Sequence, residues 1–241
     1  MPPQPLSNVR PNARIKWGHP IDLGARPDAA LGIARCIAAW SAAEFQLGLM
    51  MVAMLGEVAA PTVAIYLELL ALRTRTLALS AAAKSTLNQH EHQIFEVLVS
   101  MTRASAKKRD KLAHWLWTYS DDISDALLLI DPRDQIPQVA PAVVKLANNR
   151  PVRESEFIVA PSRIYVYRPG DFAEIEREFR ELENCLVVFN QMVLESSVGE
   201  QFRLLTELSR RPPVAQRLFR LRKDQNSRAP PEQSPDAGDP D

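Results

Sequence analysis

Residues 171–193 read DFAEIEREFRELENCLVVFNQMV, and this stretch decides the fold class. Its large apolar residues recur at steps of three and four, which is the period of one face of an α-helix. That face comprises Phe172, Ile175, Phe179, Leu182, Leu186, Phe189 and Val193. Asp171 and Glu174 have the spacing of a capping box at its start. The pattern predicts a long amphipathic helix that packs against other helices.

The same period occurs in three earlier stretches, so we expect an all-α protein built as a helical bundle. A first helix is capped by Asp28 and ends at Gly56. A second runs from Pro61 to about Leu87, and a third starts near Asn88. The predicted face of the first helix comprises Ile33, Ile37, Trp40, Glu44, Leu47, Met51 and Leu55. That of the second comprises Leu70, Arg73, Leu77 and Ala81. That of the third comprises Ile94, Leu98, Met101, Ser105, Leu112 and Leu116.

Residues 121–170 break the helical period. Ala126–Ile130 and Arg163–Tyr167 have the composition of short β-strands. Between them we expect a loop, because prolines stand at positions 132, 137, 141, 151 and 161. The sequence therefore predicts a small β-hairpin or lid inserted before the last long helix.

Four segments follow from these patterns. Residues 1–27 are rich in proline and are expected to form an arm without regular structure. Residues 28–208 form the helical domain, including the insertion. Residues 209–223 form a basic segment that includes Arg210, Arg211, Arg217 and Lys223. Residues 224–241 have the composition of a disordered tail.

The composition limits the possible functions. The chain has 29 basic and 29 acidic residues, so it is not a general binder of polyanions, and any contact with nucleic acid needs a local basic patch. Two distant cysteines, Cys36 and Cys185, exclude a disulfide scaffold and fit a reducing compartment. The longest apolar stretches are interrupted by charged residues such as Glu44, which predicts a cytoplasmic protein with no membrane span.

One short motif carries chemistry: Arg109-Asp110-Lys111-Leu112-Ala113-His114. Asp110 and His114 are four residues apart, so they stack on one side of the predicted third helix, away from its core face. Arg103, Lys107 and Trp117 fall on the same outward stripe. Together with Lys111, the cations of this surface could hold a phosphodiester, and Trp117 could stack on a base.

The spacing Arg-(Asp/Asn)-x-x-x-His late in a long helix resembles the signature of the HEPN superfamily. Trp40-Ser41-x-x-Glu44 in the first helix is similar to a feature of bacterial members. The resemblance covers the helical core by pattern and departs from the family in one place, because Trp115 follows the histidine where relatives often have glycine. It implies a homodimeric, metal-independent endoribonuclease that needs no cofactor, of the toxin or phage-defence type, with RNA as substrate and possible pairing with an antitoxin or another protein.

By this resemblance, His114 would take the proton of a ribose 2′-OH, Arg109 would stabilise the phosphate, and Asp110 would orient both. The products would be a 2′,3′-cyclic phosphate and a 5′-OH. The residue types fit these roles, since histidine is the usual general base near neutral pH and arginine matches the geometry of phosphate. In the dimer, Trp115 and Trp117 would become buried where the two copies meet.

Several alternatives remain open. The motif residues could be a solvated helix face, the domain could bind RNA or a partner without catalysis, or it could be a protein–protein adaptor. Glu44 could support Arg109 at the active site or form a structural ion pair with Arg73. His90 and His92 have the spacing of a metal-binding pair but lack an evident third ligand, so no metal site is expected.

Overall fold

The computed structural model describes residues 3–16, 21, 23–56, 59–153 and 159–226. It is mostly helical with a small antiparallel sheet, as the sequence predicts. The chain divides into two compact units, one of Met1–Met50 with Ser100–Val187 and the other of Met51–Val99 with Val188–Asp241. The division falls inside three helices: α2 (Pro27–Leu55), α5 (Gln89–His114) and α7 (Pro169–Leu194).

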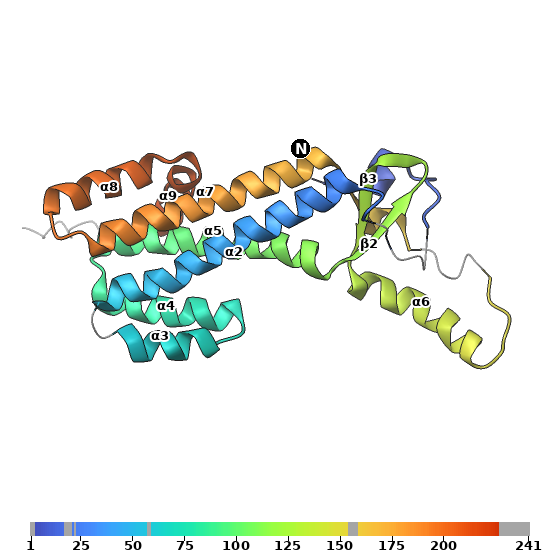
Figure 1. Ribbon diagram of the computed structural model, residues 1–241, viewed down its shortest axis with the longest axis horizontal. Coiled ribbons are helices and arrows are strands. Elements are labelled where there is room, and N and C mark those ends of the chain that lie inside the picture. Colours follow the sequence, from blue (N-terminus) through green and yellow to red (C-terminus); the bar gives the residue numbers. More distant parts are fainter. Residues whose placement is uncertain (1–2, 17–20, 22, 57–58, 154–158, 227–241) are drawn as a thin grey trace, which may run out of the picture. The chain divides into compact units, whose positions relative to one another are not determined.

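In the first unit, α2 and α7 lie side by side (Figure 1). A Cβ atom at Gly32 would lie 2.9 Å from Cβ of Phe172, so the two helices approach closely only because residue 32 is glycine. One turn further, the thiol of Cys36 donates a hydrogen bond to the carbonyl of Phe172 (3.2 Å). Burial raises the pKa of this thiol to about 11. Beyond it, the ring of Trp40 packs edge-to-face on Phe179, with centroids 5.7 Å apart.

The predicted face of α7 is confirmed from Phe172 to Phe189, where its members are buried, and Val193 is half-buried. The predicted face of α2 is confirmed in part: Trp40, Leu47 and Met51 are buried, and the other members are half-buried. α2 ends at Leu55, before Gly56, whose φ of 56° lies in the left-handed region that favours glycine. The predicted caps are wrong, because Arg26 and Arg168 accept the first helical hydrogen bonds of α2 and α7 through their carbonyl oxygens.

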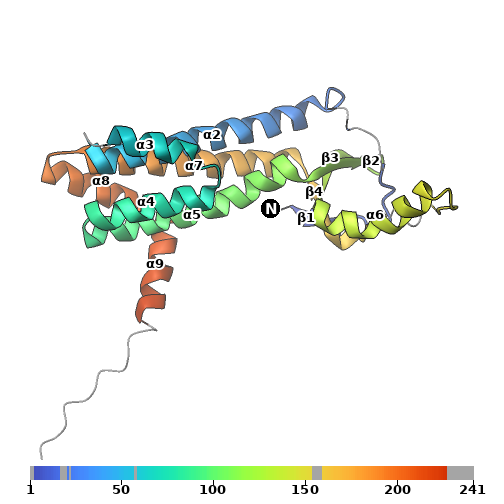
Figure 2. The same ribbon diagram turned by 90° about the horizontal axis from the view of Figure 1, so that it is seen from below.

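A four-stranded antiparallel sheet follows α5, and Figure 2 shows the helix leading into it. The strands are β1 (Gln4–Pro5), β2 (Leu116–Ser120), β3 (Ile123–Ile130) and β4 (Ile164–Tyr167), in the order β1-β4-β3-β2. β2 and β3 form a hairpin in which Trp117 pairs with Leu129, and β3 pairs with β4 so that Leu129 faces Tyr165. The sheet is therefore larger than the predicted hairpin.

The predicted end of the third helix is wrong. α5 ends at His114, and Leu116 and Trp117 belong to β2. The run Leu116–Ser120 contains aromatic and β-branched residues that favour a strand, and its pairing with the apolar β3 outweighs continuation of the helix. Leu116, expected in the helix core, is 46% exposed.

The predicted loop between the strands contains a helix, α6 (Pro132–Ala147). Its N-cap Asp131 accepts a hydrogen bond from the backbone of Arg133 (2.9 Å) and pairs with the guanidinium of the same residue. Pro137 and Pro141 lie inside this helix, so the predicted loop is wrong at these two prolines. Pro132 is at the start of α6, where a proline is favourable because no amide hydrogen is needed there.

The N-terminal arm also has regular structure, contrary to expectation. Strand β1 pairs with β4, and a short helix, α1 (Leu6–Val9), follows it. Leu6 is completely buried in one core cluster with Leu128, Ile130 and Val166 of the sheet. The prolines of the arm therefore bound short elements, and the burial of Leu6 holds these elements against the sheet.

In the second unit, the predicted second helix is two helices, α3 (Ala59–Glu68) and α4 (Leu72–Thr86), with a break that leaves Leu70 93% exposed. The predicted face is wrong as well, since Leu77 is exposed and the buried residues of α4 are Thr76, Leu79 and Ala83. The alternation of leucine with threonine and arginine in this segment left its inward face undecided.

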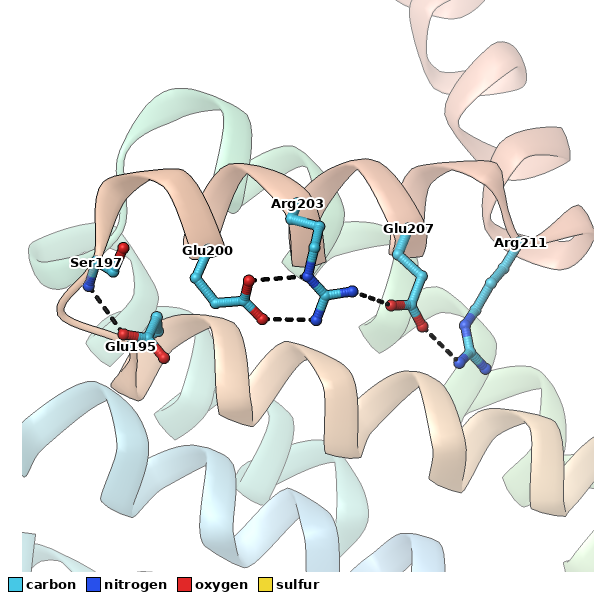
Figure 3. Close-up of polar contacts among 6 residues, drawn as sticks. All are labelled: Glu195, Ser197, Glu200, Arg203, Glu207 and Arg211. Carbon is cyan, nitrogen blue, oxygen red and sulfur yellow. Dashed lines mark hydrogen bonds and ion pairs between the residues drawn. The ribbon is translucent and has the colours of Figure 1, made fainter.

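Two further helices end the described chain, α8 (Val198–Arg210) and α9 (Pro212–Asn226). α8 lies almost wholly within the predicted helical domain, and α9 covers most of the predicted basic segment. Along α8, Glu200, Arg203, Glu207 and Arg211 alternate in charge and form a ladder of ion pairs (Figure 3). These contacts at three- and four-residue spacing support a helix whose other face buries Leu204 and Leu208. Residues 224–226 belong to α9, and the rest of the predicted tail lies outside the described residues.

Among the described residues, α2 is long and apolar enough to cross a membrane by length and composition, contrary to the expectation that no stretch qualifies. Of its most apolar window, 44% is buried inside the fold. A buried core helix meets the same two criteria, since both depend only on length and apolar content.

The close contact at Gly32 gives a prediction with a matched control on the same helix. Gly32→Ala should lower the free energy of unfolding by about 1–3 kcal/mol, because the new methyl group meets Phe172 next to its backbone. In Gly48→Ala the new methyl group has no atom within 4 Å. This variant should raise the free energy of unfolding by roughly 0.5–1 kcal/mol, because alanine favours a helix more than glycine does. Urea unfolding measures both changes, and equal shifts in the two variants would contradict the close approach of α2 and α7.

Candidate functional site

The motif residues lie in the last turns of α5, which ends at His114. The side chain of Arg109 is 26% exposed and that of Asp110 is 56% exposed. His114 is exposed. A guanidinium nitrogen of Arg109 lies 3.4 Å from a carboxylate oxygen of Asp110, so these two side chains form an ion pair. The motif therefore combines one partly enclosed cation with two exposed groups.

Arg109 is positioned by a tryptophan of α2. Its Cζ atom lies 5.4 Å from the ring centroid of Trp40, within the range of a cation–π interaction. Trp40 is only 3% exposed, and its indole nitrogen donates a hydrogen bond to Glu44 (3.0 Å). The ring of Phe179 also packs edge-to-face on Trp40, so the indole has little freedom to turn. The guanidinium of Arg109 thus rests on a rigid surface.

One atom of Arg109 has no partner in the described part of the chain. Its Nε is buried and makes no hydrogen bond there. A buried donor without an acceptor is unfavourable for stability, and because it is buried, this nitrogen is out of reach of a ligand. The part of the guanidinium that is exposed is the part that an oxyanion could contact, since guanidinium groups match the geometry of phosphate.

Glu44 is half-buried and contacts Trp40, which in turn contacts Arg109. This arrangement is compatible with the hypothesis that Glu44 supports the arginine, with the indole as the intermediate. Arg73, the alternative partner considered from the sequence, is exposed on α4 in the second unit.

His114 makes no hydrogen bond or ion pair with any residue that the structure describes. The expected orienting contact between Asp110 and His114 is not among the interactions of the described residues, although Asp110 does contact Arg109. The imidazole is therefore free to contact a ligand. Its orientation would be fixed by that ligand or by a second copy of the chain.

Lys111 lies between two aromatic rings. Its ammonium is 4.8 Å from the ring centroid of Trp115 and 5.3 Å from that of Tyr165. Burial, with a smaller contribution from Lys108, lowers the pKa of Lys111, and Asp131 opposes this shift. Trp115, which departs from the family pattern, thus packs over a lysine of the motif itself.

Trp117 does not lie on the outward stripe of the helix, contrary to prediction. It belongs to β2, is half-buried, and stacks on Phe172 with centroids 6.1 Å apart. Its indole nitrogen donates a hydrogen bond to the carbonyl of Leu112 (3.2 Å), one of the acceptors left open at the end of α5. This tryptophan is a structural residue of the first unit, which leaves it unsuited to stack on a base or to line a dimer interface.

The other predicted RNA-binding residues remain on the surface. Arg103 and Lys107 are exposed on α5. Lys108 forms an ion pair with Glu178 of α7, which ties α5 to α7 on that side. The cations free to approach a ligand near His114 are therefore Arg103 and Lys107, with Arg109 partly accessible.

Among the described residues, no group of three His, Cys, Asp or Glu side chains could hold a metal ion. Comparison with protein-family models, curated proteins and solved structures finds no match to this chain. The family resemblance therefore rests on the motif and its helical setting alone.

Sequence reasoning missed the part played by Trp40 and Tyr165. For Trp40 a signal was present, because Trp40 and Glu44 are four residues apart on one helix and must be neighbours. For Tyr165 none was present, since its contact with Lys111 depends on strand pairing between distant segments.

The Trp40–Glu44 contact predicts a specific loss of stability. Glu44→Ala removes the charged acceptor from a buried indole and should lower the free energy of unfolding by about 1.5–3 kcal/mol. Glu44→Gln keeps an oxygen at this place, so it should lose less than half as much. Chemical unfolding of both variants tests this, and equal losses would show that the hydrogen bond contributes nothing.

Proposed function

We propose that this chain is a metal-independent endoribonuclease of the HEPN type whose active site is the end of α5. The observation that supports the proposal most is that the last turns of α5 carry both a guanidinium supported by Trp40, that of Arg109, and an exposed imidazole, that of His114. A fixed cation next to an accessible base is what transfer of a phosphoryl group within RNA requires.

In this reaction, His114 accepts the proton of a ribose 2′-OH, and the 2′-oxygen attacks the adjacent phosphorus. The bond from phosphorus to the 5′-oxygen breaks, and a proton goes to that oxygen. The products are a 2′,3′-cyclic phosphate and a 5′-OH, with no water consumed. Arg109 stabilises the negative charge on the phosphate oxygens, and Asp110 holds one guanidinium nitrogen through the ion pair.

RNA binding in this proposal depends on a few local cations. Arg103 and Lys107 are exposed on α5 near the motif, and both can contact phosphates beyond the one that reacts. Because few phosphates are neutralised, binding should depend only moderately on salt. Trp117 takes no part in binding bases, since its ring stacks on Phe172. The biological setting we propose is that of a toxin or phage-defence effector.

The exposure of His114 suggests why a second copy would help. A histidine on an open helix end has no water-excluded cleft to position a 2′-OH. Two copies related by a two-fold axis would place two such helix ends in one groove. We therefore propose a homodimer in which the surface around His114 and Lys107 meets itself, without Trp117.

End-labelled RNA incubated with the protein in excess EDTA should be cut and should carry cyclic phosphate ends. His114→Ala should slow cleavage at least about 100-fold because the base is lost, and Arg109→Ala should do so because phosphate charge is no longer stabilised. Rates from gel electrophoresis measure these effects, with circular dichroism to show that the variants fold.

His90→Ala is a matched control, since His90 is an exposed histidine at the start of the same helix, in the second unit. It should cleave at the wild-type rate. If RNA is bound but not cut by the wild type, the domain is a non-catalytic RNA-binding module. If His114→Ala cuts as fast as the wild type, the proposed site is wrong.

The dimer can be tested by light scattering, which should give twice the 27.0 kDa mass of the chain at micromolar concentration. Lys107→Glu should lower this mass, because it changes the charge of the surface that meets its copy, while Arg35→Glu on the exposed side of α2 should leave it unchanged. A wild-type monomer that still cuts RNA would remove the dimer from the proposal.

A further inference from the structure

The helices α2 and α7 begin in the same unusual way. The first helical hydrogen bonds run from Ala30 to the carbonyl of Arg26 (3.1 Å) and from Phe172 to the carbonyl of Arg168 (3.4 Å). An arginine is therefore the N-cap of both helices, followed in each by a proline. The favoured N-cap residues carry an oxygen that accepts from the first-turn amides, and arginine has none. Proline has no amide hydrogen and the amide of Asp171 donates to the carbonyl of Arg168 (2.9 Å), so the amides left for another acceptor are those of Asp28, Ala29 and Gly170.

Both N-cap arginines bind the same segment of β3. Arg26 donates to the carbonyls of Ser124 (3.0 Å) and Ala126 (3.3 Å), and its guanidinium also lies over the ring of Tyr119. Arg168 forms an ion pair with Asp125 at 2.9 Å. The starts of α2 and α7 are thus both fixed to residues 124–126 by their N-cap arginines. All of these residues belong to the first unit.

A cavity of about 490 Å³ lies at this place, within the size range of small-molecule sites. The first turn of α2, the start of α7 and residues 124–127 of β3 line it. Its apolar wall includes Leu127 and Phe172, and its charged wall includes Arg26 and Asp28. Because both helices point their N-termini toward it, their aligned peptide dipoles add partial positive charge.

Tyr167 is an independent sign of a ligand. Its side chain lines the cavity and is only 4% exposed, and its hydroxyl makes no hydrogen bond with any described residue. The oxygen itself is not fully enclosed by the described residues, so the hydroxyl is open to the cavity and is suited to bind something there. Burial, helped by the carboxylate of Asp171, raises the pKa of Tyr167, which keeps the hydroxyl protonated and able to donate.

The charges of the wall select the kind of ligand. Asp125 is neutralised by Arg168, while no ion pair joins Arg26 or Asp28 to a described residue. A simple anion would be attracted by Arg26 and the helix N-termini but repelled by Asp28. A simple cation would be attracted by Asp28 but repelled by Arg26 and the helix N-termini. A molecule that carries both charges on neighbouring atoms can satisfy both residues, which are two positions apart.

We propose that this cavity binds a free α-amino acid with an apolar side chain. Its carboxylate accepts from the first-turn amides, from Arg26 and from the hydroxyl of Tyr167, and its ammonium group pairs with Asp28. The apolar side chain lies against Leu127 and Phe172. This site shares no residue with the end of α5, so it does not depend on the proposed ribonuclease activity.

Isothermal titration of the full chain with three probes tests the proposal. L-Leucine should bind, whereas 4-methylpentanoate lacks the ammonium group and 3-methylbutylamine lacks the carboxylate. Each should bind at least about tenfold more weakly, because a hydrogen-bonded charge is left unpaired. No binding of L-leucine, or equal binding of 4-methylpentanoate, would overturn the proposal, the latter in favour of a plain anion site.

Two variants test the residues. Asp28→Asn should weaken L-leucine about tenfold while leaving 4-methylpentanoate no weaker, since a repulsive charge is removed. Tyr167→Phe should weaken L-leucine severalfold with an unchanged circular dichroism spectrum. Glu68→Gln, an exposed carboxylate of α3 in the other unit, should bind like the wild type. Unchanged affinity for L-leucine in Asp28→Asn would overturn the proposal.

Discussion

At Gly32, α2 and α7 approach so closely that one added carbon atom would lie 2.9 Å from Phe172. This contact sets how closely the two helices can pack near their N-termini. At their N-termini it places two Arg-Pro sequences beside the same segment of β3. Two turns along α2, Trp40 meets Phe179 and forms the surface on which Arg109 rests. The cavity and the motif therefore depend on the same packing of two helices.

The motif at the end of α5 divides into a fixed part and a free part. Arg109 is held by an aromatic face and an adjacent carboxylate, so its charge is placed before any ligand arrives. His114 has no such partner among the described residues. An enzyme with this arrangement would gain its final geometry only when RNA or a second copy encloses the histidine. Trp115 packs over Lys111 within the motif and so reduces the number of cations that RNA can reach.

Regular periodicity predicted the long helices well. The apolar face of residues 172–189 and the end of α2 at Gly56 could be read from sequence because both depend on local spacing and backbone preference. The strand at Trp117 could not, since its partner lies across a turn and the preceding helix has no strong stop signal. Likewise, the prolines of α6 signalled a loop, although Asp131 caps a helix there. The candidate site residues Arg109, Asp110 and His114 could be found from sequence because they form one short motif. The contact of Arg109 with Trp40 could not, because it depends on how α2 packs on α5.

The most direct test measures cleavage and binding of two RNA oligonucleotides by the full chain in excess chelator. One is unmodified, and the other is the same sequence with every ribose 2′-O-methylated. The 2′-oxygen of the first can attack the neighbouring phosphate, and that of the second cannot. We expect the protein to cut the unmodified RNA and to leave the methylated copy intact while binding both. Cleavage of the methylated copy, or cleavage of neither, would contradict the role assigned to Arg109 and His114.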